Sequence, residues 1–177
     1  MMTPSSRQDE LYEETAARHA PALERLARSY ELDPDKRKDL LQEIHLALWR
    51  SFAGFAAQCS LRTWVYRVAH NVAASHVMRH RRLASRRMVS LDEIADMPSA
   101  VDHESVAGQQ NALDRIYILI HRLNPPERQV MLLYLEGLDA ASIGEVTGIS
   151  AGNVAIRIHR IKKILAERFR QGGNDGR

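Results

Sequence analysis

The chain has 177 residues, 45% of them hydrophobic and 27% charged, which is the balance of a soluble globular protein rather than a disordered one. The formal net charge is +3, and a single cysteine excludes an internal disulfide or a thiolate metal cluster. The apolar runs, such as 130–135, are too short to span a membrane, and the first residues lack a signal-peptide pattern, so we expect a cytoplasmic protein.

The charges are distributed in blocks along the chain. Residues 62–87 contain seven Arg and no acid, whereas residues 88–114 contain six acids and no Lys or Arg. Residues 157–170 contain six Lys or Arg against a single acid, Glu167. The two basic blocks predict binding of a polyanion at two separate places. A solvated helix face remains the alternative for either block alone.

Helical periodicity dominates the first half of the chain. Residues 39–50 place Leu41, Ile44 and Leu48 on one stripe of a helix. Ser60 is a suitable N-cap for a long helix that continues to about Arg82. The inward side of this long helix is expected to carry Leu61, Val65, Val68 and Val72.

Between residues 84 and 110 the periodicity fades into an acidic segment rich in small residues, which predicts a flexible linker. An apolar helical stripe follows and stops before Asn124, because two prolines come next. A further helix then begins with proline in its first turn and ends near Gly137. The expected fold is therefore all-α, with two small helical domains at 8–83 and 111–170 joined by the linker 84–110.

The end of the second domain has the layout of a helix-turn-helix. Asp139 can cap a short helix through Thr147, Gly148 can supply a left-handed turn residue, and Ser150 can cap the last helix. Two helices around such a turn form the motif that places its second helix in the major groove of DNA. The inward side of the last helix is expected to carry Val154, Ile158, Ile161 and Leu165.

The opposite side of the last helix offers groups that suit a major groove. Asn153 and Arg157 are of types that read adenine and guanine edges, and Ile156 can meet a thymine methyl group. Arg160 and Lys163 can hold phosphates at the rim. The alternative is a purely structural amphipathic helix with a solvated basic face, but an outward Ile brings no benefit to such a helix.

Two further faces belong to the first domain. The long helix presents Arg67, His70 and Asn71 opposite its apolar stripe, ahead of an Arg cluster, which suits a partly single-stranded nucleic acid. The helix at 39–50 has an acidic outward side edged by Leu46 and Trp49, a pattern typical of a protein-binding surface. Trp64 is interpreted as core filler rather than as a base platform.

No arrangement of residues predicts catalysis. His76 and His80 have helical spacing, but no acid or cysteine lies nearby in the sequence to complete a metal site. The chain also lacks a Gly-rich phosphate loop. We expect neither an enzyme nor a metal or other cofactor.

Three stretches resemble the extracytoplasmic-function group of bacterial sigma-70 family sigma factors. They are DLLQEIHLALWR at 39–50, SLRTWVYRVAHNVA at 60–73, and LNPPERQVMLLYLEGLDAASIGEVTGIS at 123–150, in the order of the family. The resemblance implies a protein that binds core RNA polymerase and directs transcription initiation at particular promoters. It further implies control by an anti-sigma factor, and a cytoplasmic location at the nucleoid when bound to polymerase.

The resemblance also implies roles for particular residues. The helix at 39–50 would contact the polymerase clamp, the long helix would contact the minus-ten element, and the last helix would contact the minus-thirty-five element. The second domain would also meet the polymerase flap. The acidic linker would lie in a basic channel of the polymerase. The implied polymerase contacts are Asp39, Gln42, Glu43, Leu46 and Trp49; the minus-ten contacts are Arg67, His70, Asn71 and Arg79; the minus-thirty-five contacts are Asn153, Ile156, Arg157, Arg160 and Lys163.

The sequence departs from the family pattern at a few positions, which bear on promoter sequence rather than on the class of activity. Ser75, Met78 and Gly144 stand where Asp, Arg and Ala are usual, and Asn153, Ala155 and Ile156 replace a frequent Thr, Lys, Ser. Ala155 and Ile156 suggest an alternative, a sigma-like decoy or adaptor that binds an anti-sigma factor without touching DNA. A third reading is an autonomous helix-turn-helix repressor, which the motifs of the first domain disfavour.

Overall fold

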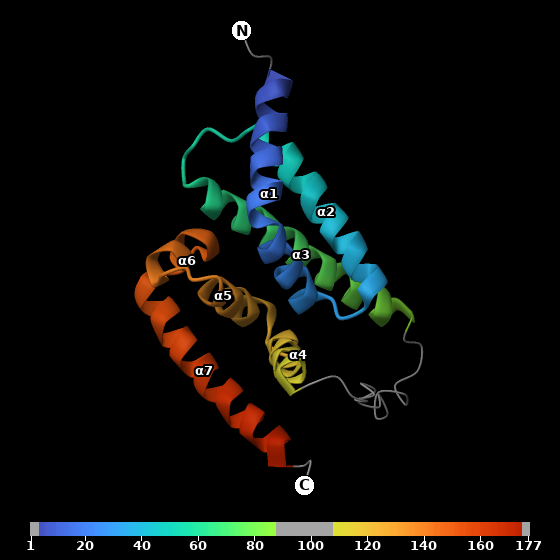
Figure 1. Ribbon diagram of the computed structural model, residues 1–177, viewed down its shortest axis with the longest axis vertical. Helices are drawn as coiled ribbons and strands as arrows, with labels where there is room; N and C mark the ends of the chain where they lie inside the picture. The colour runs from blue at the N-terminus through green and yellow to red at the C-terminus, as the bar shows by residue number, and fades with distance from the viewer. Residues whose placement is uncertain (1–3, 88–107, 175–177) are drawn as a thin grey trace.

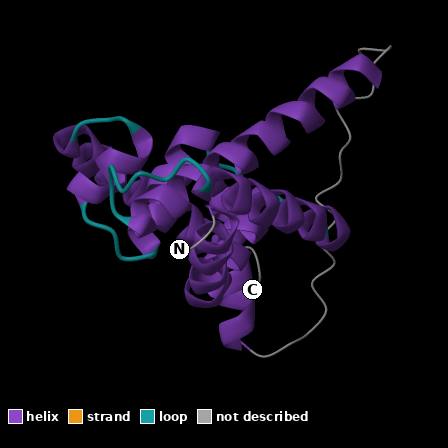
Figure 2. Cartoon of the chain, turned by 90° about the horizontal axis from the view of Figure 1, so that it is seen from above, coloured by secondary structure: helices purple, strands orange, loops and turns teal. Residues whose placement is uncertain are grey.

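The computed structural model describes residues 4–87 and 108–174, and every regular element in these two ranges is a helix (Figure 2). The expected all-α fold is confirmed. In Figure 1, α1 to α3 form one bundle and α4 to α7 form a second bundle beside it. The helices are α1 (Pro4–Tyr30), α2 (Pro34–Phe52), α3 (Leu61–Arg87), α4 (Gly108–His121), α5 (Pro125–Leu135), α6 (Ala140–Thr147) and α7 (Ala151–Asn174).

The second helix begins earlier than its hydrophobic stripe suggests. Asp33 caps it by accepting hydrogen bonds from the backbone N–H groups of Asp35 and Lys36, at 2.9 and 3.1 Å, and Pro34 occupies its first turn. Leu40, Ile44 and Leu48 are buried against the neighbouring helices, whereas Leu41 is only half-buried. The buried stripe thus includes Leu40 in the place where Leu41 was expected.

The long helix α3 is capped as expected, and its buried arc is wider than the expected stripe. The Ser60 hydroxyl accepts from the backbone N–H of Thr63 at 3.0 Å, which confirms the N-cap, and the helix continues to Arg87. Val65, Ala69 and Ala73 are completely buried, while Val68 and Val72 are half-buried. The buried arc is wide because α3 contacts α1 and α2 on one side and α5 and α6 on another.

Local capping builds the helix-turn-helix of the second bundle. The Asp139 carboxylate accepts from the backbone N–H of Ser142 at 2.7 Å, and this hydrogen bond lowers the pKa of Asp139. Gly148 adopts the left-handed region at φ 79°, and Ser150 accepts from the N–H of Asn153 at 3.4 Å. The expected caps and turn are therefore confirmed.

The last helix runs along the outer edge of the second bundle (Figure 1), where it contacts α4, α5 and α6. Val154 and Ile161 are completely buried, and Ile158 and Leu165 pack half-buried against the core, as their spacing predicted. The two bundles touch through α1 with α4 and through α3 with α5 and α6. Most of the expected linker, residues 88–107, lies outside the described residues.

Candidate nucleic-acid interface

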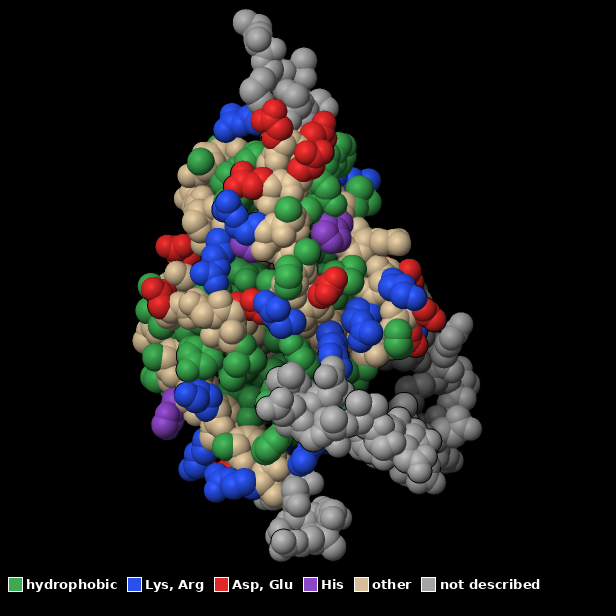
Figure 3. Space-filling view, in the orientation of Figure 1, with side chains coloured by type: hydrophobic (Ala, Val, Ile, Leu, Met, Phe, Trp, Pro, Cys, Tyr) green, Lys and Arg blue, Asp and Glu red, His purple; other side chains and the backbone are tan. Residues whose placement is uncertain are grey.

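The outward side of α7 carries five residues that were expected to contact DNA, which we call the α7 surface. Ile156 is the most exposed large hydrophobic side chain described, with 68% of its surface accessible. Asn153 and Lys163 are also exposed, and Arg157 is half-buried. In Figure 3, Lys and Arg side chains gather toward the lower end of the molecule, where α7 ends, whereas acidic side chains gather over α1 at the upper end. The α7 surface consists of Asn153, Ile156, Arg157, Arg160 and Lys163.

One member of the α7 surface is tied to the preceding helix. The Arg160 guanidinium pairs with the carboxylate of Glu127, in the first turn of α5, while the Arg160 side chain stays 59% exposed. The pair restricts the rotamers of a long side chain without removing it from solvent. The ion pair therefore holds the exposed Arg160 side chain toward the start of α5.

Residues of α3 that were expected to contact DNA lie in three different environments. Asn71 and Arg79 are exposed, and Arg79 forms an ion pair with Glu43 of α2. Arg67 is half-buried and donates to the backbone carbonyl of Glu145 in α6. His70 is 2% exposed, so the placement of His70 on the open side of α3 was wrong.

His70 is buried because α1 packs over it. Its Nδ1 lies 3.2 Å from the hydroxyl of Tyr30, and the two rings meet edge to face at 5.9 Å between centroids. Burial lowers the pKa of His70 to about 3, since the charged imidazolium would lose its hydration. A neutral His70 therefore shares a hydrogen bond at Nδ1 with the Tyr30 hydroxyl and joins α1 to α3.

The five residues expected to bind polymerase share one side of α2, which we call the α2 surface. Leu46 and Trp49 are 47% and 38% exposed, although both are large hydrophobic side chains. The Trp49 indole N–H donates to the carboxylate of Asp9 at 2.8 Å, which orients the ring beside α1. The α2 surface consists of Asp39, Gln42, Glu43, Leu46 and Trp49.

Trp64, in contrast, serves the packing of the first bundle. Its indole N–H donates to the Ser51 hydroxyl at 2.9 Å, and its ring lies 5.3 Å from the ring of Phe55 between centroids. The half-buried Trp64 ring packs against the core beside Phe55, which lies in the loop between α2 and α3. These contacts favour its interpretation as core filler.

The first and second bundles meet at two acidic residues that the sequence patterns did not single out. The Glu136 carboxylate accepts from Nε and Nη2 of Arg25, at 2.7 Å each, and Tyr66 donates to the same carboxylate at 3.4 Å. Glu145 accepts from the hydroxyl of Thr63 at 3.3 Å. No sequence signal marked these pairs, because their members are single polar or charged residues separated by long stretches of chain.

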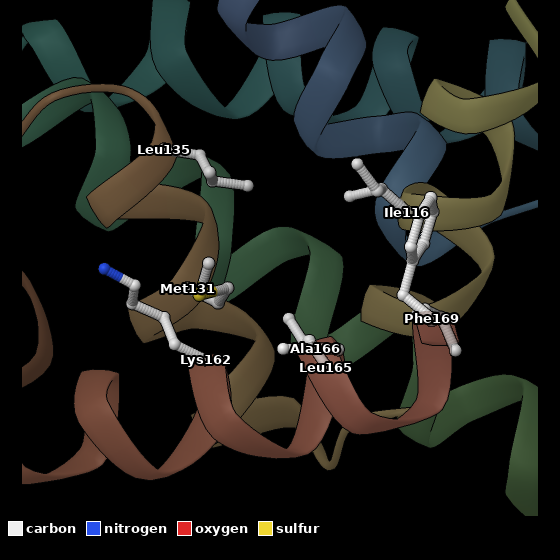
Figure 4. Close-up of a pocket in the computed structure, with 8 residues that line it drawn as sticks. Ile116, Met131, Leu135, Lys162, Leu165, Ala166 and Phe169 are labelled. Carbon is white, nitrogen blue, oxygen red and sulfur yellow. The ribbon is translucent and has the colours of Figure 1, made fainter. Parts of the chain in front are cut away.

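An apolar hollow of about 310 Å³ lies in the second bundle between α4, α5 and the C-terminal half of α7. Figure 4 shows Leu135 on one side of this hollow and Ile116 with Phe169 on the other. It is separate from the N-terminal half of α7, where Asn153 and Ile156 lie. The lining residues are Ile116, Leu119, Met131, Leu135, Lys162, Leu165, Ala166 and Phe169.

Within the described ranges, no helix has both the length and the apolar character of a membrane span.

Comparison with protein families gives two matches, Sigma-70 region 2 over residues 15–83 and Sigma-70, region 4 over residues 113–165. The first matched segment contains most of α3, and the second contains the helix-turn-helix. They therefore include most of the residues that form the α3 and α7 faces described above.

Individual proteins with similar sequences and structures agree with the family matches. The ECF RNA polymerase sigma factor SigF of Caulobacter vibrioides is 32% identical over 142 residues, which cover 78% of this chain and 73% of that protein. The chain spans only 31% of the length of SigG of Mycobacterium tuberculosis, at 30% identity over 118 residues. A solved complex of the sigma factor RpoE with the anti-sigma factor NepR from Bartonella quintana shares the fold, with a TM-score of 0.67, 20% identity and coverage of 88% of this chain and 94% of that chain.

The matched regions occur in one chain in the order region 2, then region 4, and the chain covers more than two thirds of a relative that is over 30% identical. These findings agree with the three stretches of sequence that resemble the family. The chain belongs to the extracytoplasmic-function group of sigma-70 family RNA polymerase sigma factors.

Proposed function

We propose that the protein binds core RNA polymerase and directs transcription initiation from a particular set of promoters. The observation that carries this proposal is the α7 surface, which lies on the second helix of a helix-turn-helix. In this role Asn153 and Arg157 contact base edges of the minus-thirty-five element, Ile156 contacts a thymine methyl group, and Arg160 and Lys163 contact phosphates. We assign these contacts to the second domain, residues 111–170.

The first domain, assigned to residues 8–83, would supply the other two contacts. Arg67, Asn71 and Arg79 of α3 are proposed to bind the opened minus-ten element, where a basic helix face suits single-stranded DNA. We leave His70 out of the contact set, because its buried ring joins α3 to α1. His70 would instead hold α3 in place.

The α2 surface is the proposed site for the polymerase clamp. Leu46 and Trp49 are large apolar side chains left exposed beside the carboxylates of Asp39 and Glu43, an arrangement that favours a protein partner over DNA. The second domain is proposed to meet the polymerase flap, with residues 84–110 as the linker between the two attachments. No cofactor is needed for these steps.

An anti-sigma factor is the proposed regulator of the protein. The similar fold of RpoE, solved in complex with the anti-sigma factor NepR, supports such a partner. The protein would then act in the cytoplasm and associate with the nucleoid when it is bound to polymerase.

Run-off transcription with purified core polymerase tests the proposal. Genomic promoter fragments are transcribed with core polymerase alone and with core plus the protein, and we expect new transcripts of defined length only in the second case. Core binding without a transcript from any fragment would refute the promoter-recognition function and favour the decoy. DNA binding without any core binding would instead favour a repressor.

A matched pair of variants tests the α2 surface separately. Leu46→Glu introduces a charge in the proposed contact and is expected to weaken core binding at least tenfold, since apolar anchors at interfaces are worth about 1–2 kcal/mol or more. Leu32→Glu makes the same change at a Leu of similar exposure, 40% against 47%, outside the α2 surface. Equal losses in the two variants would contradict the assignment of the α2 surface.

A further inference from the structure

A second hollow, of about 350 Å³, lies where side chains of α1, α2 and α4 meet. Three arginines line it, Arg25 and Arg28 from α1 and Arg37 from α2, and we call it the arginine hollow. None of its described lining residues belongs to the α2 surface or to the α7 surface. Its volume lies within the range of about 300–1,000 Å³ that is typical of sites for small molecules.

Positive charge exceeds negative charge in the arginine hollow. Glu24 is the single acid among its described lining residues. Arg25 already has a counter-ion, since the Glu136 carboxylate accepts from its Nε and Nη2 at 2.7 Å each. The charges of Arg28 and Arg37 still outnumber that of Glu24. Charges of one sign around a hollow concentrate the electrostatic potential there, so the arginine hollow attracts an anion.

The two remaining arginines suit phosphate in particular. The guanidinium carbon of Arg28 lies 5.0 Å from the ring centroid of Tyr117, and this contact restrains a long side chain. Arg37 is half-buried, and none of the described ion pairs includes it. A guanidinium group can donate two parallel hydrogen bonds to one phosphate group. A chain of linked phosphates can therefore satisfy Arg28 and Arg37 together.

The rest of the arginine hollow is apolar. Pro21, Leu41 and Tyr117 complete its lining, and Leu41 packs half-buried against the core, which holds it in place. An inorganic polyphosphate would leave this apolar wall in contact with water. A ligand that also carries an uncharged ring system would cover the wall, which is favourable. A nucleotide combines both parts in one molecule.

We propose that the arginine hollow binds a nucleoside triphosphate, with Arg28 and Arg37 on the phosphates and Leu41 and Tyr117 against the nucleoside. The site shares no residue with the proposed contacts to DNA or polymerase, so the inference does not rest on the proposed function. Because α1, α2 and α4 all line the hollow, a bound nucleotide stabilises the folded chain and raises its melting temperature.

Isothermal titration calorimetry of the free full chain tests the site, with ATP, AMP, adenosine and sodium triphosphate as probes. The titrations contain neither polymerase nor DNA and are made at a fixed salt concentration. ATP should bind most tightly. AMP and sodium triphosphate should each bind at least tenfold more weakly, a difference of about 1.4 kcal/mol, because AMP has one phosphate and sodium triphosphate has no nucleoside. Adenosine should give no heat of binding.

Single variants locate the site on the chain. Arg37→Gln should weaken ATP binding at least tenfold. Arg50→Gln makes the same change at an exposed position of the same helix, and Arg168→Gln makes it in the basic run of α7; both should keep the wild-type affinity. Leu41→Ala should weaken the binding of ATP but leave that of sodium triphosphate unchanged. Circular dichroism shows whether each variant is folded.

The outcomes separate a built site from general attraction to a basic protein. Equal losses in Arg37→Gln, Arg50→Gln and Arg168→Gln would show attraction to the whole surface and overturn the inference. Equal affinities of the wild type for ATP and sodium triphosphate would overturn the assignment to a nucleotide, as would a folded wild type that binds no ATP. A loss confined to Arg37→Gln and Leu41→Ala supports the inference, whatever the run-off assay gives.

Discussion

Ile156 has an unusual position for a large aliphatic side chain, on the outward side of α7 among polar neighbours. Contact with an apolar partner would remove this side chain from water, which is favourable. The 5-methyl group of thymine is the apolar group that the major groove offers. A contact between Ile156 and a thymine methyl group would require close approach of the two groups but no hydrogen bond.

Replacing single thymines of a minus-thirty-five element by deoxyuridine removes only the methyl group. At one position, we expect this change to weaken binding of wild-type protein about fourfold, because burial of one methyl-sized group is worth about 0.8 kcal/mol. Ile156→Ala should bind the two templates equally. Lys163→Ala should weaken binding to both templates while keeping the fourfold difference, and a wild-type protein indifferent to every deoxyuridine would remove the proposed role of Ile156.

His70 makes stability depend on pH in a direction set by its burial. In the folded protein the pKa of His70 is about 3, whereas the usual value for histidine is near 6.5. Between pH 3 and pH 6.5 the unfolded chain therefore binds more protons at His70 than the folded protein does. The contribution to stability is complete above pH 6.5 and is lost as the pH falls. Between pH 7 and 5, His70 alone should lower the free energy of unfolding by about 2 kcal/mol.

Denaturant unfolding at pH 7, 6 and 5 measures this contribution. His70→Gln should show a shallower fall in the free energy of unfolding than the wild type. His159→Gln, on the exposed side of α7, removes a histidine without disturbing the core and should keep the wild-type slope. Parallel slopes for the wild type and His70→Gln would contradict a buried neutral imidazole.

At the level of the helices, α6 approaches the turn before α7 so closely that it depends on a missing side chain. A Cβ atom added to Gly144 would lie 2.6 Å from the backbone carbonyl oxygen of Ile149. Because the clashing atom belongs to the backbone, the overlap could be relieved only if the turn between α6 and α7 moved. Gly144 therefore sets the spacing of the helix-turn-helix, at a position where the family commonly has Ala.

Gly144→Ala should lower the stability of the second domain by about 1 kcal/mol, since steric cost outweighs the better helix propensity of Ala. The matched control is Gly152→Ala in α7, where an added Cβ has nothing within 4 Å and propensity alone should raise stability by up to about 1 kcal/mol. Amide hydrogen exchange in α6 and α7 measures both effects locally. Changes of the same sign in the two variants would argue against the steric explanation.

The caps and turns of these helices were predictable because each depends on residues close in sequence. Asp139, Gly148 and Ser150 act on backbone groups within three or four positions of themselves. The orientation of α3 was only partly predictable, since helices cover it on more than one side and the pattern of Val residues indicates a single side. His70 was placed outside for that reason, although Tyr30 of α1 buries it.

At the scale of the molecule, the contact between the two domains depends on pairs that no local pattern connects. Arg25 and Glu136 are 111 residues apart, and Arg67 and Glu145 are 78 residues apart. Each is an ordinary surface charge when considered alone. The sequence therefore indicated two domains and their separate faces, while the packing of one face under the other domain required the structure.

The polar composition of these contacts predicts a response of the free chain to salt. Exposed and partly exposed ion pairs are screened as the Debye length falls from about 10 Å at 0.1 M to about 3 Å at 1 M. The radius of gyration of the wild type should therefore rise over this range of sodium chloride. Arg25→Glu, which lacks the ion pair with Glu136, should change less than the wild type, and a wild type that stays compact throughout would indicate that apolar packing dominates the contact.

Trp49 gives the protein a built-in spectroscopic probe. The chain has two tryptophans, and Trp49 is 38% exposed on the α2 surface, whereas Trp64 is half-buried with its indole N–H bonded to Ser51. Polymerase docking on the α2 surface would move Trp49 from water into an apolar contact and shift its emission to the blue, which is measured after the emission of core polymerase alone and the nearly constant emission of Trp64 are subtracted. The side chain that anchors the proposed complex would thus also report, without any attached label, the moment at which the complex forms.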